Sequence, residues 1–325
     1  MKTFFRYFLI FIAIVLVMIA GVLIYVKTAL PNVGQAQSIR IEYTPERIER
    51  GRYLANSVTV CMDCHSKRDY SRFSAPMIKG TEGMGGERFD QTAGLPGVFY
   101  SSNITPDGIA RYTDGELLRV ITTGVNKEGR AMFPLMPYPY YSKMDTEDIY
   151  SIIAYLRTLP AIHNPVPASS ADFPMNFILN LIPKKADPQP LPAKSDVLAY
   201  GAYLTNAAGC RECHSQVDKG QVIPELAFGG GRVFQFPDGT TVVSANITPD
   251  AETGIGKWTK AGFVARFQAY RDASAAVQLA AGDQKTIMPW TLYAQMNAED
   301  LEAVFTYLQS LKPLRATKAA AAAKS

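Results

Sequence analysis

All four cysteines of the chain stand in two short clusters, each closed by a histidine. The clusters are two copies of one pattern, C-x-x-C-H, made by Cys61, Cys64 and His65 and by Cys210, Cys213 and His214. Two thiols three positions apart can add across the two vinyl groups of one haem, and the adjoining imidazole then reaches the iron from one face. The sequence therefore predicts two covalently bound haem c groups, attached through the four cysteines, with both histidines as axial iron ligands.

Three alternative roles for the cysteine pairs fit the sequence less well. Disulfides suit an exported protein, but they leave the two histidines at matching offsets without a role. A thioredoxin-like redox pair lacks the neighbouring βαβ pattern and does not need a second copy. A zinc site could take two cysteines and a histidine, but exported proteins seldom use such sites structurally.

The second axial position of each iron is predicted to be a methionine sulfur, a ligand that raises the reduction potential. Met136 and Met288 stand 152 positions apart, and each precedes a proline that stiffens the loop presenting the sulfur. Met144 and Met296 are also 152 positions apart. Met296 directly precedes a helix cap, a position suited to packing. We therefore assign Met136 and Met288 as the axial ligands.

Two other side chains compete for the same role. Met132 lies close to Met136 in the first copy, but it has no methionine counterpart in the second. His163, the third histidine of the chain, stands among prolines and has no repeat partner. We expect a solvated loop histidine at 163 and leave the choice between Met132 and Met136 open.

The duplication extends beyond these motifs, and its order is kept throughout. The paired blocks are Gly51-Arg52-Tyr53-Leu54 with Gly201-Ala202-Tyr203-Leu204, Asn103-Ile104-Thr105-Pro106-Asp107 with Asn246-Ile247-Thr248-Pro249-Asp250, and Met136-Pro137, Tyr141 and Glu147-Asp148 with Met288-Pro289, Tyr293 and Glu299-Asp300. Two modules follow, at residues 44–160 and 195–313.

Each module is predicted to be mostly helical. Thr44, Pro45 and Glu46 provide a helix cap, a proline at the first position and an acid in the first turn. A capping box at 113–116 opens a second helix. Asp145 and its counterpart Asn297 are expected to cap helices whose apolar residues recur at i, i+3, i+4 and i+7.

The N-terminus carries an apolar segment that we interpret as a transmembrane anchor within residues 1–30. Twenty uncharged residues run from Tyr7 to Val26, enough for a helix to span a hydrocarbon core of roughly 30 Å. A cleaved signal peptide is the alternative, but its apolar region is usually shorter and ends at a clean cleavage site. Lys2 and Arg6 favour a cytoplasmic N-terminus, which leaves the rest of the chain on the periplasmic side of the cytoplasmic membrane.

Two further segments lack the module pattern. Seven prolines fall within residues 161–194, which favours an extended inter-domain strap over a helix. Its apolar run from Phe173 to Leu179 predicts packing across the modules, with a membrane-surface or partner contact as the alternative. The Ala/Lys-rich end of the chain, residues 314–325, is predicted to be a flexible tail.

Composition narrows the class of protein. The 325 residues are 47% hydrophobic and 19% charged, so extensive disorder is not expected. The formal net charge is +4, but three basic residues flank the N-terminal apolar run and leave +1 for the remaining 295 residues. No basic field of the size that nucleic-acid binding requires remains.

The chain resembles the class I cytochrome c fold used twice, and more narrowly the multihaem cytochrome c subunits of membrane-bound alcohol and gluconate dehydrogenases. The likeness covers about residues 44–313, and it rests on the two C-x-x-C-H motifs, the Asn-Ile-Thr-Pro-Asp blocks, both Met-Pro pairs, Gly254-Ile255-Gly256-Lys257-Trp258-Thr259 and Phe173-Pro174-Met175-Asn176-Phe177. The chain departs from that family in having two haem motifs where those subunits carry three, and in its N-terminal anchor.

The resemblance implies an electron-transfer subunit that passes electrons from a dehydrogenase toward the respiratory chain, through quinone or a terminal oxidase. An electron carrier with two His/Met haems has no open iron position, so we expect no catalysis by the chain itself. A dihaem peroxidase is the alternative, and it would need one haem with an openable distal position. The equivalent Met-Pro pairs of the two modules argue against that enzyme.

Overall fold

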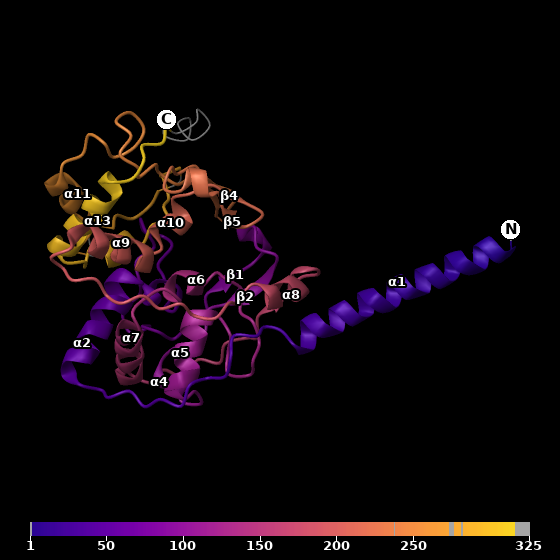
Figure 1. Ribbon diagram of the computed structural model, residues 1–325. Coiled ribbons are helices and arrows are strands. Elements are labelled where there is room, and N and C mark those ends of the chain that lie inside the picture. The colour runs from indigo at the N-terminus through magenta and orange to yellow at the C-terminus, as the bar shows by residue number, and fades with distance from the viewer. Residues whose placement is uncertain (1, 237, 273–275, 281, 316–325) are drawn as a thin grey trace.

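The computed structural model describes residues 2–236, 238–272, 276–280 and 282–315, and it confirms a mainly helical protein with an N-terminal apolar helix (Figure 1). Helix α1 (Lys2–Thr28) projects away from a rounded body that contains the other described elements. We call residues 44–160 module 1 and residues 195–313 module 2. Their independence as domains stays a prediction, since buried side chains of both belong to one continuous core.

The two modules contain matching series of helices. Module 1 contains α2 (Pro45–Tyr53), η1 (Leu54–Val58), α3 (Cys61–Cys64), η2 (Gln91–Ala93), α4 (Pro106–Ile109), α5 (Asp114–Thr123), α6 (Tyr138–Tyr141) and α7 (Thr146–Thr158). Module 2 contains α9 (Val197–Ala207), α10 (Cys210–Cys213), η4 (Pro224–Leu226), α11 (Lys260–Gln268), α12 (Trp290–Tyr293) and α13 (Ala298–Gln309). The segment between the modules contains α8 (Met175–Ile178) and η3 (Leu179–Leu181).

In the part of the chain that the structure describes, β structure consists of short antiparallel pairs. The strands are β1 (Arg88–Phe89), β2 (Gly97–Tyr100), β3 (Ser170–Ala171), β4 (Val217–Asp218), β5 (Gln221–Val222), β6 (Val233–Gln235) and β7 (Thr241–Val243). Strand β2 pairs with both β1 and β3, β4 pairs with β5, and β6 pairs with β7. These pairs hold the loops that follow the cysteine motifs.

Local sequence signals set the helix starts as predicted, with one exception. Thr44 Oγ1 accepts a hydrogen bond from Arg47 N at 3.3 Å, and the capping box of α5 forms between Thr113 and Glu116. Asp145 Oδ1 accepts from the backbone N–H of residue 147 at 2.8 Å. Asn297 precedes α13, but its side chain makes no capping bond, so that part of the prediction is wrong. Its backbone N–H donates to Tyr53 Oη at 3.2 Å instead.

In each module the first long helix crosses the last at a glycine. A Cβ atom on Gly51 of α2 would lie 1.8 Å from the carbonyl oxygen of Ser151 in α7. The equivalent atom on Gly201 of α9 would lie 2.0 Å from the carbonyl oxygen of Ala303 in α13. Backbones can approach this closely only where one residue lacks a side chain. The repeated glycines therefore fix the same helix crossing twice.

The modules meet through two equivalent tyrosine–aspartate pairs. Tyr53 Oη of module 1 donates to Asp300 Oδ2 of module 2 at 2.6 Å. Tyr203 Oη of module 2 donates to Asp148 Oδ2 of module 1 at 2.7 Å. Since Tyr53 corresponds to Tyr203 and Asp148 to Asp300 in the repeat, each module presents the same surface to the other. This is the reciprocal pairing of an isologous dimer, built within one chain.

The inter-domain strap at residues 161–194 stays a prediction. Its second half contacts module 1, where Asp187 N donates to Ser142 O at 3.0 Å and Leu191 N donates to Asp145 Oδ2 at 2.7 Å. The expectation of a wholly extended segment is wrong, because the apolar residues 175–181 coil into α8 and η3. This stretch contains no proline, and Pro174 stands directly before it as the N-cap of α8, where proline is compatible with a helix start. All of its residues except two asparagines are Met, Phe, Ile or Leu, and both helices contact α1.

The predicted tail begins within the ordered body. Leu314 O accepts a hydrogen bond from Asn246 Nδ2 at 2.6 Å, so residue 314 is tied to module 2. Residues 316–325 of the predicted tail lie outside the described residues.

The glycine crossing predicts a large loss of stability in the variant Gly51→Ala. The added methyl group forces α2 away from α7, and overpacking of this kind lowers the free energy of unfolding by about 1–3 kcal/mol. Denaturant unfolding of the full chain, followed by helical circular dichroism, measures the effect. Gly262→Ala in α11 is the matched control, because its new methyl group meets only the Thr259 side chain, at 3.1 Å. Equal stability of the two variants would contradict the crossing.

Candidate functional site

Both cysteine motifs form one short helical turn that follows a left-handed residue. Val60, with φ 44°, precedes α3, and Gly209, with φ 63°, precedes α10. This conformation turns the chain sharply, so that both cysteines of a motif leave one turn of helix. All four cysteines are free and partly buried. The two motifs thus have the same local backbone.

Burial keeps these thiols protonated. It raises the pKa of the Cys64 and Cys210 thiols to about 12 and that of Cys213 to about 11. Redox-active cysteines need the opposite shift, toward the thiolate. Among the described residues, no three His, Cys, Asp or Glu side chains are grouped as a metal-binding cluster. Paired neutral thiols on one turn of helix fit thioether attachment to a haem.

The two histidines are held in the same way. His65 Nδ1 bonds to Ser102 O at 2.7 Å, and His214 Nδ1 bonds to Ala245 O at 2.7 Å. A carbonyl oxygen only accepts, so each Nδ1 carries the proton and each Nε2 keeps its lone pair for a metal. Burial lowers the pKa of both imidazoles, which keeps them neutral. A neutral imidazole with a fixed ring orientation is the form that ligates haem iron.

A glycine closes the loop around each histidine. Gly85 N donates to His65 O at 2.8 Å, and a Cβ atom at residue 85 would lie 2.4 Å from the backbone of Ser102. Gly230 N donates to His214 O at 2.8 Å, and its Cβ atom would lie 2.5 Å from the backbone of residue 245. Each glycine therefore lets the carbonyl that orients the imidazole approach the motif. With the paired thiols, this cradle fits a covalently attached haem in each module.

The Asn-Ile-Thr blocks form hydrogen bonds to the residue that closes each module, and we assign none of their side chains as an iron ligand. Asn103 Nδ2 donates to Ile162 O at 2.8 Å, and the Ile162 N–H donates to Thr105 Oγ1 at 3.2 Å. Asn246 and Thr248 bind Leu314 in the same way, at 2.6 and 3.1 Å. These bonds hold the segment that immediately follows the orienting carbonyl. The blocks therefore support the histidines indirectly.

The Met-Pro segments lead into α6 and α12, which are tied to the cysteine motifs. Tyr141 Oη donates to Thr59 O at 2.9 Å, and Tyr293 Oη donates to Ala208 O at 2.6 Å. Each acceptor stands two residues before the first cysteine of its motif. Both tyrosines are buried, so these bonds fix the Met-Pro segment against the motif in each module.

The methionines of the two modules differ in burial, but burial does not separate Met136 from Met132, and the ligand assignment stays a prediction. Met144 and Met296 are fully buried in the core, where they pack. Met136 and Met288 are only partly buried, at the edge of that core. Met132 is also partly buried, and its backbone N–H donates to Gly124 O at 2.8 Å. His163 is exposed over 84% of its side chain and lies 3.4 Å from Asp107, as expected for a loop histidine.

The structure brings the two cysteine motifs toward one another across the module interface. Tyr140, four residues after Met136, donates to Glu212 Oε2 inside the second motif at 3.0 Å. Asn206 Nδ2 donates to Tyr140 O at 3.0 Å. Asp63 of the first motif lies near enough to raise the pKa of Cys213 electrostatically, beside the larger effect of burial.

Sequence reasoning missed the residues that join the motifs and the modules. The repeated blocks contain all four residues of the Tyr–Asp pairs: Tyr53, Tyr203, Asp148 and Asp300. The repeat therefore marked them as a matched set, but it could not show that each tyrosine pairs with an aspartate of the other module. Tyr140 has no tyrosine counterpart, since residue 292 is a leucine, and the repeat gives no signal for it.

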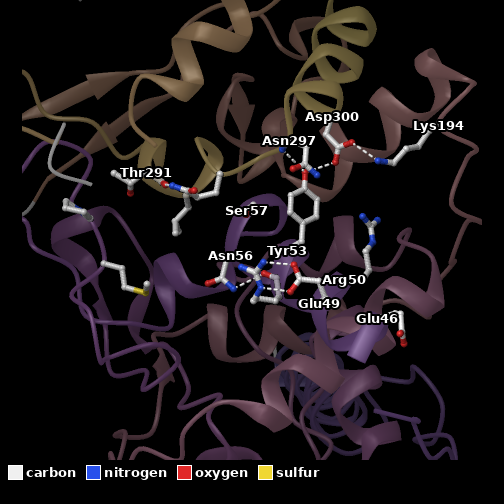
Figure 2. Close-up of a pocket in the computed structure, with 15 residues that line it drawn as sticks. Glu46, Glu49, Arg50, Tyr53, Asn56, Ser57, Lys194, Thr291, Asn297 and Asp300 are labelled. Atoms are coloured by element: carbon white, nitrogen blue, oxygen red, sulfur yellow. Dashed lines mark hydrogen bonds and ion pairs between the residues drawn. The ribbon is translucent and has the colours of Figure 1, made fainter. Parts of the chain in front are cut away.

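A pocket of about 880 Å³ opens at the module interface, between α2 and the start of α13 (Figure 2). Figure 2 shows Tyr53 pointing across it toward Asp300, with Lys194 on the far side of that carboxylate. The arginines of its wall are paired, Arg50 with Asp148 and Arg52 with Glu49. We assign this pocket no ligand.

Comparison with known proteins finds several relatives of the chain. No family model matches it. It is 26% identical over 283 residues to the cytochrome c subunit of the quinone alcohol dehydrogenase of Gluconacetobacter polyoxogenes, covering 82% of this chain and 56% of the relative. It is 27% identical over 293 residues to the gluconate 2-dehydrogenase cytochrome c subunit of Pantoea cypripedii, covering 81% and 59%.

The match to a third relative covers a shorter stretch of the chain. A dihaem c-type cytochrome of Cereibacter sphaeroides is 28% identical over 164 residues, covering 48% of this chain and 53% of the relative. The chain thus spans little more than half the length of these relatives. Over about four fifths of its own length, this mainly helical chain with its repeated C-x-x-C-H motif is similar to the cytochrome c subunits of bacterial dehydrogenases.

Proposed function

We propose that this chain is a membrane-anchored dihaem c-type cytochrome that transfers electrons between a dehydrogenase and the respiratory chain. The observation that carries the proposal is the repeated site, in which a C-x-x-C-H turn and an imidazole bonded through Nδ1 to a carbonyl occur twice. Its similarity to cytochrome c subunits of dehydrogenases supports the electron-transfer role and a dehydrogenase as the partner. A terminal oxidase or quinone is the proposed acceptor.

The protein's own residues would hold each haem and tune it, while the haem supplies a reversible one-electron couple. In module 1 the attachment points are Cys61 and Cys64, with His65 and Met136 on the iron. In module 2 they are Cys210 and Cys213, with His214 and Met288. With both axial positions filled by nitrogen and sulfur, no open iron site remains, which disfavours the peroxidase alternative.

Electron exchange between the modules is supported by the approach of their motifs. The bond from Tyr140 to Glu212 connects the segment that follows Met136 with the second motif directly. The reciprocal Tyr–Asp pairs also join the two modules. These contacts hold the two proposed haem sites next to one another.

Helix α1 supports the membrane anchor. Of the described helices, it alone is long and apolar enough to cross a bilayer, and 6% of its most apolar stretch is buried against the body. Lys2 and Arg6 at its start favour insertion with the N-terminus in the cytoplasm, and the haem-bearing modules then lie on the periplasmic side.

Substitution of the proposed axial methionines tests the ligand assignment. A ferric haem with His/Met ligation has a weak absorption band near the red end of the visible spectrum. Met136→Leu and Met288→Leu are each expected to remove about half of this band, because leucine cannot ligate one of the two irons. Met132→Leu is the matched control and should leave the band intact. Loss of the band in the control, or its survival in either ligand variant, would contradict the assignment.

The charges around the two motifs differ. Arg68 of module 1 lies between two carboxylates, 3.0 Å from Asp63 Oδ2 and bonded twice to Glu87, and all three side chains are nearly buried. In module 2 the motif acid Glu212, which corresponds to Asp63, bonds to Arg232 at 2.6 Å, and Arg232 stands where module 1 has Glu87; the motif also contains Arg211. Net negative charge stabilises the ferric state and lowers a reduction potential. We therefore expect the haem of module 1 to have the lower potential.

The variant Glu87→Gln tests this order. Removal of one buried negative charge should raise the reduction potential of the module 1 haem and leave that of module 2 nearly unchanged. Spectroelectrochemical titration of the full chain resolves the two centres. Glu128→Gln, which removes the same charge from the surface of module 1, is the control. If both variants shift the potential equally, or Glu87→Gln moves only the higher-potential centre, the assignment is wrong.

The dehydrogenase partnership has a direct test in the membranes that contain the chain. Addition of a primary alcohol, gluconate or fructose is expected to reduce its haem within the turnover time of the enzyme, because the partner passes the electrons of its substrate to this chain. A strain lacking the chain is the control. Failure of every substrate to reduce the haem, with dithionite reducing it fully, would contradict this partnership.

A further inference from the structure

The segment between the modules exposes an unusual run of large apolar side chains. Phe173, Ile178 and Leu181 are 78%, 39% and 57% exposed, and they stand within nine residues on or beside α8 and η3. Phe173 stacks edge-on against Phe177, with ring centroids 6.3 Å apart. Clustered apolar exposure of this kind marks an interaction surface. We call residues 173–181 the apolar strap.

The apolar strap touches the end of α1 where that helix enters the body. Lys27 Nζ donates to Asn176 O at 3.0 Å and lies 4.8 Å from the centroid of the Phe177 ring. Both α8 and η3 pack against α1. Figure 1 shows α8 on the side of the body from which α1 emerges. The apolar strap is therefore held beside Lys27, at the C-terminal end of α1.

The length of α1 sets the depth of this end relative to a bilayer. The uncharged run from Tyr7 to Val26 matches a hydrocarbon core of roughly 30 Å. Lys27 directly follows this run, so its ammonium group lies among the lipid headgroups when the helix spans the membrane. The apolar strap, bonded to Lys27, must then lie at the same depth, at the boundary between headgroups and acyl chains.

We propose that the apolar strap is a second membrane contact, in which Phe173, Ile178 and Leu181 enter the outer leaflet beside α1. The inference rests on the proposed membrane-spanning role of α1. Apolar side chains gain free energy on leaving water at this boundary, and the exposed Lys184 and Lys185 that follow suit anionic headgroups. Continuity with α1 makes a lipid surface the occupant of this face.

The contact has a consequence for electron transfer. A single helix would let the body rotate and tilt about its axis. A second point of attachment fixes which face of the modules points away from the membrane. Just before the apolar strap, β3 pairs with β2 of module 1, and β2 ends two residues before Ser102, whose carbonyl bonds to His65.

A nitroxide label on the full chain tests the proposal. The variants Leu181→Cys and Phe173→Cys are labelled after haem attachment and reconstituted in phosphatidylcholine–phosphatidylglycerol vesicles. The label should collide more often with oxygen, which concentrates in lipid, than with a water-soluble nickel chelate. Ser310→Cys, at the exposed end of α13, is the control and should show the reverse order.

Labels at 173 and 181 that respond like the label at 310 would overturn the proposal. The proposal would also be overturned if the labels became shielded from both probes only after a partner protein is added, because a protein would then cover the apolar strap. If α1 does not span the membrane, the result is different, because alkaline washing would then release the chain from the vesicles. If the chain stays bound to the vesicles while the labels at 173 and 181 remain in water, only the proposed membrane contact of the apolar strap is contradicted.

Discussion

One hydrogen bond, from a histidine ring to a backbone carbonyl, organises each half of this molecule. The bonds from His65 to Ser102 and from His214 to Ala245 fix the tautomer and direction of the imidazole. The carbonyl can reach the ring because a glycine stands opposite it. The Asn-Ile-Thr block holds the segment that directly follows that carbonyl.

Duplication also accounts for how the two sites are held together. A module that presents Tyr53 and Asp148 on one face pairs with its own copy through the same two side chains. The copies diverged where the motifs meet, since Tyr140 faces Glu212 while its counterpart is a leucine. The charges around the motifs diverged as well, so two sites of the same geometry have different electrostatics. Under the proposed function, this difference separates the reduction potentials of the two haems.

Local signals made much of this predictable from sequence. The C-x-x-C-H motifs, the capping box at Thr113 and the caps at Thr44 and Asp145 act within a few residues, and the structure has them as expected. The orienting carbonyls carry no side-chain signal, so they could not be predicted. The Tyr–Asp pairs needed the relative placement of two modules, and α8 forms in a proline-free stretch of a proline-rich segment, where it contacts α1. The methionine ligands stay a prediction.

Covalent attachment of haem at both motifs is the central claim, and intact mass analysis of the full chain tests it most directly. Chain purified from cells that mature c-type cytochromes should weigh more than its polypeptide by two haem groups. Digestion should then place one group on the peptide with Cys61 and Cys64 and the other on the peptide with Cys210 and Cys213. A mass equal to the bare polypeptide, or haem on one peptide alone, would contradict the account.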